Sequence, residues 1–335
     1  MIARIVSAGL KAVVWSSAAV GAFALLLTAL VATPLTRPPE LLSISQGRSA
    51  VDFSALPAVE RFQARDGTAL GFRHYPARGP ATGRIAIVIH GSTGSSAGSI
   101  HALSSALAAH GIETWAMDVR GHGTSGTRGD IAYVGQLEDD LADLVAVARK
   151  TNPAAPITLI GHSASGGFAL RVAGSPIQNL FARTVLVAPY LGYNAPTNRP
   201  NSGGWAKPDT PRIIGLLALR KLGIDCCDAL PVLAYAVPPN SENSLVPTYS
   251  DRLMRNFANH PDFRADLAAA TRPLTIYSGT DDELMYADKY AEAVRGITPA
   301  IEVKLIEGVD HIGVVSKPAA VSIIADDVAK REVNS

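Results

Sequence analysis

ITLIGHSASGGFAL, residues 157–170, is the stretch of sequence that decides the fold. Its first four residues, ITLI, form a mostly apolar run that predicts a buried strand. The next five residues, GHSAS, predict a sharp turn with Ser163 at its apex, and the following glycines and apolar residues predict the start of a helix. Such a strained turn lifts the apical side chain clear of the sheet, as a nucleophile requires. The helix directs free backbone N–H groups and the positive end of its dipole toward Ser163.

One position departs from the G-x-S-x-G pattern of such turns. Gly161 is the small residue two positions before the apex, but Ser165 stands where the pattern has its second glycine. A chance match in a Gly/Ser-rich turn is the alternative interpretation. The strand and helix signals on either side argue against it.

The composition is that of a globular protein without a strong charge. The chain has 335 residues, of which 47% are hydrophobic, and a net charge of +1. This length fits two domains, or one α/β core with an insertion. A nearly neutral chain has no strong field for nucleic acid or acidic partners. The two cysteines, Cys226 and Cys227, are adjacent, so we predict neither a disulfide framework nor a metal site.

Residues 1–36 are predicted to form a membrane segment. Arg4 and Lys11 give it a basic start, and its apolar part, residues 12–32, would span about 31 Å as a helix, close to the thickness of a bilayer core. A cleavable signal peptide, leaving a secreted or periplasmic protein, is the alternative. Signal peptides have a shorter apolar region than this one. They also have an A-x-A cleavage site, and none precedes a cut after Ala32. We favour a single-pass anchor, with the catalytic domain outside the cytoplasm.

The rest of the chain alternates strands and helices. Residues 37–58 contain prolines and scattered polar residues and are predicted to be a linker. Two antiparallel strands followed by strand–helix alternation predict an α/β fold, with a mostly parallel sheet and helices on both faces. The predicted strands are 59–64, 69–75, 85–89, 112–117, 157–160, 185–188, 274–277 and 301–305, and helical spacing occurs at 100–107 and 137–148.

A gap of about 84 residues precedes the strand that begins at Leu274. It is too long for a structureless loop, and its apolar runs at 213–222 and 229–237 resemble helices. We therefore predict a helical cap, residues 190–272, inserted into a core formed by 59–189 and 273–335. The insertion leaves from the sheet edge at which open α/β folds bind ligands. A decoration far from the site is the alternative.

Four stretches in a fixed order carry a family resemblance: IVIHGSTGSS at 87–96, MDVRGHGTSGTRG at 117–129, LIGHSASGG at 159–167, and the pair SGTDDE at 278–283 with GVDHIG at 308–313. With them the chain resembles the α/β-hydrolase superfamily of serine hydrolases, and within it the monoglyceride lipase/lysophospholipase-like, or serine aminopeptidase S33-like, branch. The resemblance covers residues 59 to about 330. Its motifs are specific for fold and catalytic class and only weakly specific for substrate.

Ser163 is the predicted nucleophile, and a serine hydroxyl needs an adjacent base. His311 follows the last predicted strand in a glycine-bounded loop, which places it at the carboxyl edge of the sheet near Ser163. His162 lies on the turn itself and is predicted to pack or orient. His90 and His122 lie in glycine turns and are weaker candidates for the base.

The base needs a carboxylate to hold its tautomer. Three acidic residues, 281–283, follow the strand that begins at Leu274. The hydrolase pattern G-x-x-D, counted from Gly279, selects Asp282, with Asp281 as the alternative. This choice gives the Ser–Asp–His chain order of the fold. Helix capping is the alternative role for the aspartates.

Two backbone donors are needed for the oxyanion of the tetrahedral intermediate. One is the N–H of Ala164, and the resemblance implies the N–H of Ser92 as the other. The turn at 120–123 is assigned to structure. Because side chains supply acid, base and nucleophile, we predict no cofactor and no metal.

The predicted function is hydrolysis of a carboxylic ester through an acyl-enzyme. The apolar cap and the membrane segment favour a small-molecule ester or lipid with a lipophilic acyl chain. A peptidase or amidase is one alternative, but Asp225, Asp228 and Glu242 do not cluster into a site for an amine. A non-catalytic binding protein is another alternative. Dehalogenase and epoxide hydrolase chemistry is disfavoured because these relatives have Asp where this chain has Ser163. The sequence determines neither the physiological substrate nor the oligomeric state.

Overall fold

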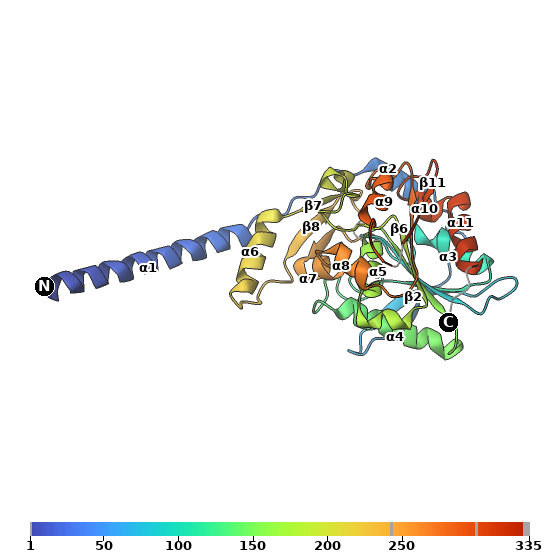
Figure 1. The fold of residues 1–335 in the computed structure, drawn as a ribbon, viewed down its shortest axis with the longest axis horizontal. Helices are drawn as coiled ribbons and strands as arrows, with labels where there is room; N and C mark the ends of the chain where they lie inside the picture. Colours follow the sequence, from blue (N-terminus) through green and yellow to red (C-terminus); the bar gives the residue numbers. More distant parts are fainter. Residues whose placement is uncertain (1, 242–243, 299–300, 331–335) are drawn as a thin grey trace.

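The computed structural model describes residues 2–241, 244–298 and 301–330, and a twisted eight-stranded sheet forms its centre (Figure 1). The strands are β1 (Glu60–Gln63), β2 (Ala69–Tyr75), β3 (Ile85–Ile89), β4 (Glu113–Met117), β5 (Ile157–His162), β6 (Arg183–Val187), β10 (Leu274–Gly279) and β11 (Glu302–Ile306). Their order in the sheet is β1-β2-β4-β3-β5-β6-β10-β11. β1 and β2 form the predicted hairpin, β2 also pairs antiparallel with β4, and the other pairs are parallel. The predicted α/β-hydrolase fold is confirmed.

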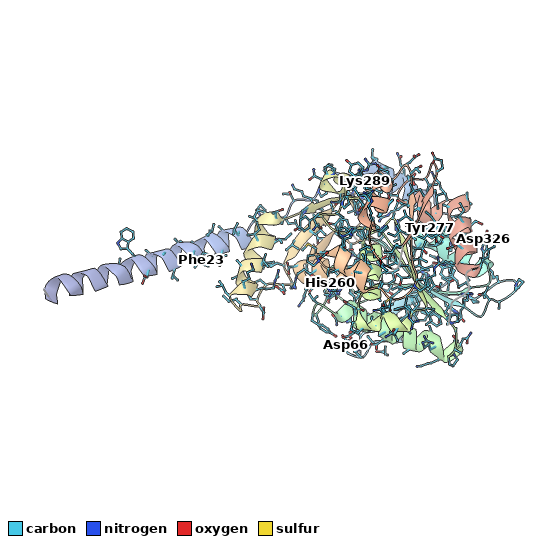
Figure 2. All side chains as sticks on the ribbon, in the orientation of Figure 1. Phe23, Asp66, His260, Tyr277, Lys289 and Asp326 are labelled. Atoms are coloured by element: carbon cyan, nitrogen blue, oxygen red, sulfur yellow. The ribbon has the colours of Figure 1, made fainter. Side chains whose placement is uncertain are left out.

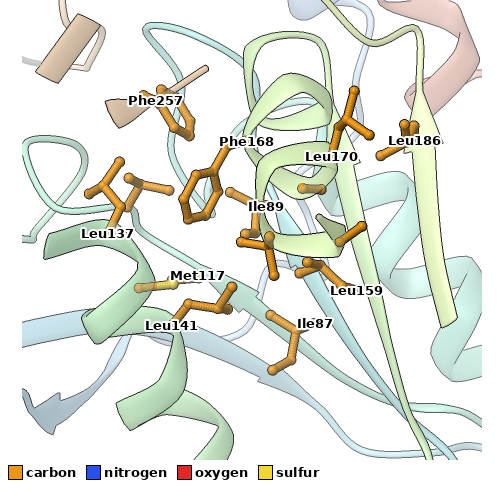
Figure 3. Packing of buried hydrophobic residues seen from close by; sticks show 14 of the residues in the cluster. Ile87, Ile89, Met117, Leu137, Leu141, Leu159, Phe168, Leu170, Leu186 and Phe257 are labelled. Atoms are coloured by element: carbon orange, nitrogen blue, oxygen red, sulfur yellow. The ribbon is translucent and has the colours of Figure 1, made fainter. Parts of the chain in front are cut away.

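Helices cover both faces of this sheet and create two apolar cores. Strand β3 shows the alternation: Ile85, Ile87 and Ile89 belong to one core, whereas Ala86 and Val88 belong to the other. Figure 3 shows the first core, where Ile87 and Ile89 meet the helices that carry Leu137, Leu141 and Phe168. The helices of the first face are α4 (Gln136–Thr151), α5 (Ala164–Ala173) and α9 (Tyr290–Ala293), and those of the second are α3 (Ile100–Ala109), α10 (Gly313–Ser316) and α11 (Pro318–Lys330), with 3-10 turns η1 (Pro176–Leu180) and η3 (Ala287–Lys289) between elements.

Residues 190–272 form a mixed insertion rather than a purely helical one. Its elements are η2 (Pro200–Gly204), β7 (Ala206–Pro208), α6 (Thr210–Lys221), β8 (Pro231–Tyr235), β9 (Thr248–Ser250), α7 (Asp251–Asn256) and α8 (Phe263–Ala269). The three strands make a second, antiparallel sheet in the order β7-β8-β9. Our helical prediction for 229–237 is therefore wrong. Short apolar runs do not distinguish strands from helices by periodicity, and Pro231 with Pro238 bounds a run too short for a helix.

The first helix, α1 (Ile2–Val31), projects from the body as one long rod (Figure 1). By length and composition, Val14–Val31 is able to cross a membrane, and only 6% of this stretch is buried in the protein. Phe23, labelled in Figure 2, lies on the rod away from the globular part and is 48% exposed. This exposure distinguishes α1 from an apolar helix in the core of a soluble protein.

The base of α1 is fixed to helix α6 of the insertion. Arg212 donates from Nε to the carbonyl oxygen of Val31 (2.9 Å) and from Nη2 to that of Thr33. The Thr33 hydroxyl donates to Asp209 Oδ1 at 2.8 Å. Gly215 allows close approach, because a Cβ there would lie 2.9 Å from a methyl carbon of Val31. The apolar rod and the insertion therefore have a defined junction.

Residues 37–58 are more than the linker we predicted. They contain helix α2 (Leu42–Ser49), in which Ile44 is only 1% exposed. The N–H of Leu41 donates to Ala236 of the insertion at 3.1 Å. A Cβ on Gly47 would lie 2.9 Å from the Cβ of Ile312, so this glycine lets α2 pack against the loop that follows β11. These contacts span long sequence separations, which explains why local pattern did not reveal them.

Candidate active site

The turn between β5 and α5 holds Ser163 in a strained conformation at the carboxyl edge of the sheet. Its φ angle is 59°, which non-glycine residues rarely adopt. Gly161 is required, since a Cβ there would lie 2.1 Å from the carbonyl oxygen of Ser165. Ser165 stabilises the turn, because its hydroxyl donates to Ile89 O (2.8 Å) and accepts from the N–H of His162 (2.8 Å). The departure from G-x-S-x-G thus adds hydrogen bonds where a glycine would make none.

Three predicted residues from distant parts of the chain meet at this turn. The Nε2 atom of His311 lies 2.9 Å from the Oγ atom of Ser163. Its Nδ1 atom lies 2.9 Å from Oδ2 of Asp282. All three side chains are buried, with Asp282 fully inaccessible. The arrangement is that of a nucleophile, a general base and an orienting carboxylate.

The three neighbouring acids have different surroundings. The other carboxylate oxygen of Asp282, Oδ1, accepts from the N–H groups of Leu284 and Met285, each at 2.8 Å. Asp281 is exposed, and its side chain contacts the Thr280 hydroxyl. Glu283 accepts from the backbone N–H of His311 at 2.9 Å. Of the three acids, only Asp282 contacts the imidazole of His311. The same side chain also caps the turn through its other carboxylate oxygen.

The electrostatics favour a carboxylate beside an imidazole that accepts a proton readily. Burial raises the pKa of Asp282, but the charge and hydrogen bond of His311 and two backbone N–H groups outweigh it, so the pKa lies below its usual value. Burial lowers the pKa of His311, whereas the charge and hydrogen bond of Asp282 raise it, with a net pKa above the ordinary histidine value. His311 is therefore a stronger base than a free imidazole.

His162 has the orienting position that the sequence predicted. Its Nε2 atom lies 3.0 Å from the carbonyl oxygen of His311, and the two rings pack with centroids 4.9 Å apart. Burial and the neighbouring His311 lower the pKa of His162 to about 3. A neutral ring with Nε2 protonated fits this contact and supports the loop that carries His311.

Two backbone N–H groups point to an oxyanion site. The N–H of Ala164 is at the first position of α5, where no intrahelical acceptor exists, and the N–H of Ser92 has no acceptor within the part of the chain that the structure describes. The next N–H in that loop, of Thr93, donates to the Tyr249 hydroxyl at 3.0 Å and is already used. The Ser92 side chain accepts from Trp205 Nε1 at 2.9 Å. These contacts with β9 and η2 fix the loop after β3.

The turn at 120–123 supports the loop after β3. Arg120 forms a buried ion pair with Asp140 (2.7 Å) and a second ion pair with the exposed Asp66 (2.9 Å). His122 Nε2 lies 2.6 Å from the Tyr249 hydroxyl, which in turn binds the loop after β3. Burial and the neighbouring His90 hold the pKa of His122 well below its usual value. His90 and His122 pack against each other at this turn, and neither forms a hydrogen bond with Ser163 in the described part of the chain.

A cavity of about 540 Å³ opens onto Ser163 and His311. The insertion contributes Trp205, Pro238 and Leu245 to its wall, whereas none of residues 210–221 lines it. The apolar run at 213–222, which we predicted to belong to the cap, therefore does not line the site, because α6 packs on α1 instead. The sequence also missed the contribution of residues 42–53, which supply Ile44, Ser45, Arg48, Ser49 and Phe53.

Asp225 and Asp228 of the insertion lie away from this cavity. Asp228 pairs with Arg220 (3.1 Å) and Arg255 (2.6 Å), and the exposed Asp225 is not part of the wall. The third acid considered for an amine site, Glu242, lies outside the described residues. Within the described ranges, no three His, Cys, Asp or Glu side chains are arranged to hold a metal ion.

A family model described as serine aminopeptidase, S33, matches residues 81–313, a span that begins just before β3 and ends just after His311. The chain belongs to this family. Among curated proteins, this S33 family member is similar to a monoacylglycerol lipase of Mycolicibacterium smegmatis, with 25% identity over 252 residues, which is 73% of this chain and 86% of the relative. It is thus an α/β-hydrolase of the monoglyceride-lipase-like branch.

Solved structures of low identity share the fold. A soluble variant of monoglyceride lipase from Saccharomyces cerevisiae aligns with a TM-score of 0.61 at 16% identity, covering 83% of this chain and 95% of that one. A monoacylglycerol lipase of Paleococcus ferrophilus gives 0.56 at 15% identity, covering 78% and 98%. A membrane phospholipase A also gives 0.56, at 13% identity, and covers 96% of this chain and 98% of its own.

Proposed function

We propose that this protein hydrolyses a carboxylic ester of a lipophilic substrate through an acyl-enzyme formed on Ser163. The observation that carries the proposal is the hydrogen-bonded series Ser163–His311–Asp282 at the wall of a 540 Å³ cavity. Membership in a hydrolase family and the lipase names of its relatives support the same class of reaction.

In the acylation step, Ser163 Oγ attacks the ester carbonyl while His311 Nε2 accepts its proton. Asp282 stabilises the imidazolium and holds Nδ1–H in place. The oxyanion receives hydrogen bonds from the N–H groups of Ala164 and Ser92. The intermediate then expels the alcohol, which takes the proton from His311.

In the deacylation step, water attacks the acyl group on Ser163, and His311 accepts a proton from that water. The second tetrahedral intermediate uses the same two N–H donors. Its collapse releases the carboxylic acid, and His311 returns the proton to Ser163. The strained φ of Ser163 places this residue at the wall of the cavity, where a substrate can reach it.

The cavity favours an ester over an amino-terminal peptide. An aminopeptidase needs a negative group for the substrate ammonium, yet the wall contributed by described residues contains no carboxylate and does contain Arg48. We therefore expect hydrolysis of a medium-chain p-nitrophenyl ester but little release from aminoacyl p-nitroanilides. The two chromogenic substrates can be compared on one preparation, and a preference for the anilide would identify a peptidase.

We also propose that α1 is an uncleaved membrane anchor and that α6 rests on the bilayer surface. Helix α6 runs across the base of the rod (Figure 1), and several of its apolar side chains are exposed. Ile214, Leu217 and Leu222 are 52%, 46% and 56% exposed, whereas Leu216 is buried. A bilayer beside α1 would cover these residues and hold the catalytic domain at the surface where lipophilic esters occur.

The full-length protein is expected to stay in the membrane pellet after a wash with alkaline carbonate. Cleavage near Ala32 would remove Val31, which accepts a hydrogen bond from Arg212 and packs on Gly215. N-terminal sequencing of the pelleted protein checks that the anchor is intact. A soluble species that starts near Thr33 would show instead that residues 1–32 are a signal peptide.

A further inference from the structure

Helix α2 carries an arginine into the catalytic cavity. The helix is held at one end by the bond from Leu41 to Ala236 and along its length by buried Ile44. Gly47 brings it within van der Waals contact of Ile312, the residue after the base. Arg48 follows at once and lines the same cavity as Ser163 and His311.

Local contacts fix the guanidinium beside the oxyanion loop. Its Nη2 donates to Thr93 Oγ1 (3.0 Å) and to the carbonyl oxygen of Ser92 (3.4 Å). The guanidinium carbon lies 5.2 Å from the ring centroid of Trp205, a cation–π contact. Trp205 is itself bonded to the Ser92 hydroxyl. The charge is thus held close to the ester carbonyl that Ser92 would bind.

Arg48 lacks the carboxylate partner that several other arginines of low exposure have. Arg120, Arg171 and Arg183 each form an ion pair, with Asp140 at 2.7 Å, Glu138 at 2.5 Å and Asp327 at 2.6 Å. No carboxylate of the described residues lies within 4.0 Å of Arg48, and its Nε and Nη1 make no hydrogen bond to that part of the protein. Arg48 is half-buried, and a cation that is partly removed from water without a counter-ion is costly, which favours an anionic ligand at this position.

We propose that Arg48 binds an anionic oxygen group, a carboxylate or a phosphate, on the substrate close to the scissile ester. The proposal rests on the proposed ester hydrolysis and narrows its substrate class. The Nε and Nη1 atoms retain N–H donors for such a group, and the delocalised charge of the guanidinium attracts it. Burial lowers the pKa of Arg48 to about 10, so the group remains charged at neutral pH.

The position of Arg48 relative to the base gives a second reason for an anionic substrate. The positive charge of Arg48 opposes protonation of His311, against the favourable effect of Asp282. A bound anion would offset this repulsion when His311 becomes an imidazolium during acylation. An anionic ester would therefore gain in binding and in the basicity of His311 together.

Two matched pairs of esters test the proposal on the full-length protein in detergent. The alcohol-side pair is 1-lauroylglycerol and 1-lauroylglycerol 3-phosphate. The acyl-side pair is p-nitrophenyl hexanoate and the mono-p-nitrophenyl ester of adipic acid. We expect Arg48→Gln to lower kcat/KM for the anionic member of at least one pair by 10- to 100-fold and for its neutral member less than threefold. Arg48→Lys should recover part of the loss, and the affected pair identifies the source of the anion.

Exposed Arg78, which binds Ser105 away from the cavity, provides the matched control. Arg78→Gln removes the same charge and should not alter the ratio of anionic to neutral rates. Equal losses on both members of both pairs with Arg48→Gln would overturn the proposal and leave Arg48 as a positioning residue of the oxyanion loop. Unchanged rates on all four esters would overturn it as well.

A binding measurement separates the anion site from the reaction itself. Calorimetry on Ser163→Ala protein should show that dodecyl phosphate binds at least 10-fold more tightly than dodecanol, and that adding Arg48→Gln removes this preference. This result would support the anion site even if the protein hydrolysed none of the esters, which would contradict only the proposed function. Equal affinity for the two amphiphiles in the protein that retains Arg48 would overturn the anion site.

Discussion

Ser163→Ala and His311→Ala are each expected to lower kcat for an ester by about 10⁴-fold or more, with KM little changed. The reason is that the nucleophile and its base act as one unit, joined here by the 2.9 Å contact between Oγ and Nε2. Steady-state kinetics on a p-nitrophenyl ester measures the loss. Near-normal folding of both variants, checked by thermal melting, confines the effect to catalysis.

The two aspartates after β10 provide a matched pair for the acid. Asp282→Asn should lower the activity without abolishing it, and it should move the acid limb of the pH profile to lower pH. The sign follows because neutral His311 is the active form and Asp282 raises its pKa above the ordinary value. Asp281→Asn, at an exposed position, should behave like the parent protein. A severe Asp281 variant beside a mild Asp282 variant would show that the acid is misassigned.

Acyl-chain length should have the second large effect. Each methylene buried in the cavity contributes about 0.8 kcal/mol, or about fourfold in kcat/KM, so acetyl to octanoyl esters should differ on the order of 10³-fold. The rise should stop when the cavity is full. A series of p-nitrophenyl esters gives the profile. A profile that is flat from acetyl to octanoyl would remove the cavity from substrate selection.

Two leucines of the insertion locate the part of it that limits chain length. Leu245 lines the cavity, whereas Leu217 on α6 is 46% exposed and does not. Leu245→Trp should move the cutoff to shorter chains, and Leu217→Trp should leave it in place. A cutoff moved only by Leu217→Trp would show that α6, and not the wall around Leu245, limits the chain length.

The sequence alone predicted the core of the fold and predicted that Ser163, Asp282 and His311 lie close together. Unbroken apolar runs such as Ile85–Ile89 belong to strands buried on both faces, and their carboxyl ends gather the loops that carry Ser163, Asp282 and His311. The glycines at these turns are strong local signals because the backbone permits little else there. Fold and candidate triad thus follow from local pattern combined with a known topology.

The parts that the sequence did not reveal depend on contacts between distant segments. Helix α2 has no strong apolar period, and its place is set by Gly47 against Ile312 and by Leu41 on the insertion. Helix α6 is apolar around most of its circumference, and pattern alone does not tell a roof from a helix that faces α1 and solvent. Arg48 had no local motif, so its role emerges only from the cavity it enters.

The central claim, a nucleophilic Ser163 activated by His311, is tested most directly by a fluorophosphonate probe followed by peptide mass spectrometry. Full-length protein in membranes should carry one phosphonyl group on the peptide that contains Ser163. The label should be absent from Ser163→Ala and strongly slowed in His311→Ala. No labelling of folded parent protein would contradict the account and favour a non-catalytic binding protein on the hydrolase fold. Labelling at another serine would also contradict it, because the nucleophile would then be a different residue.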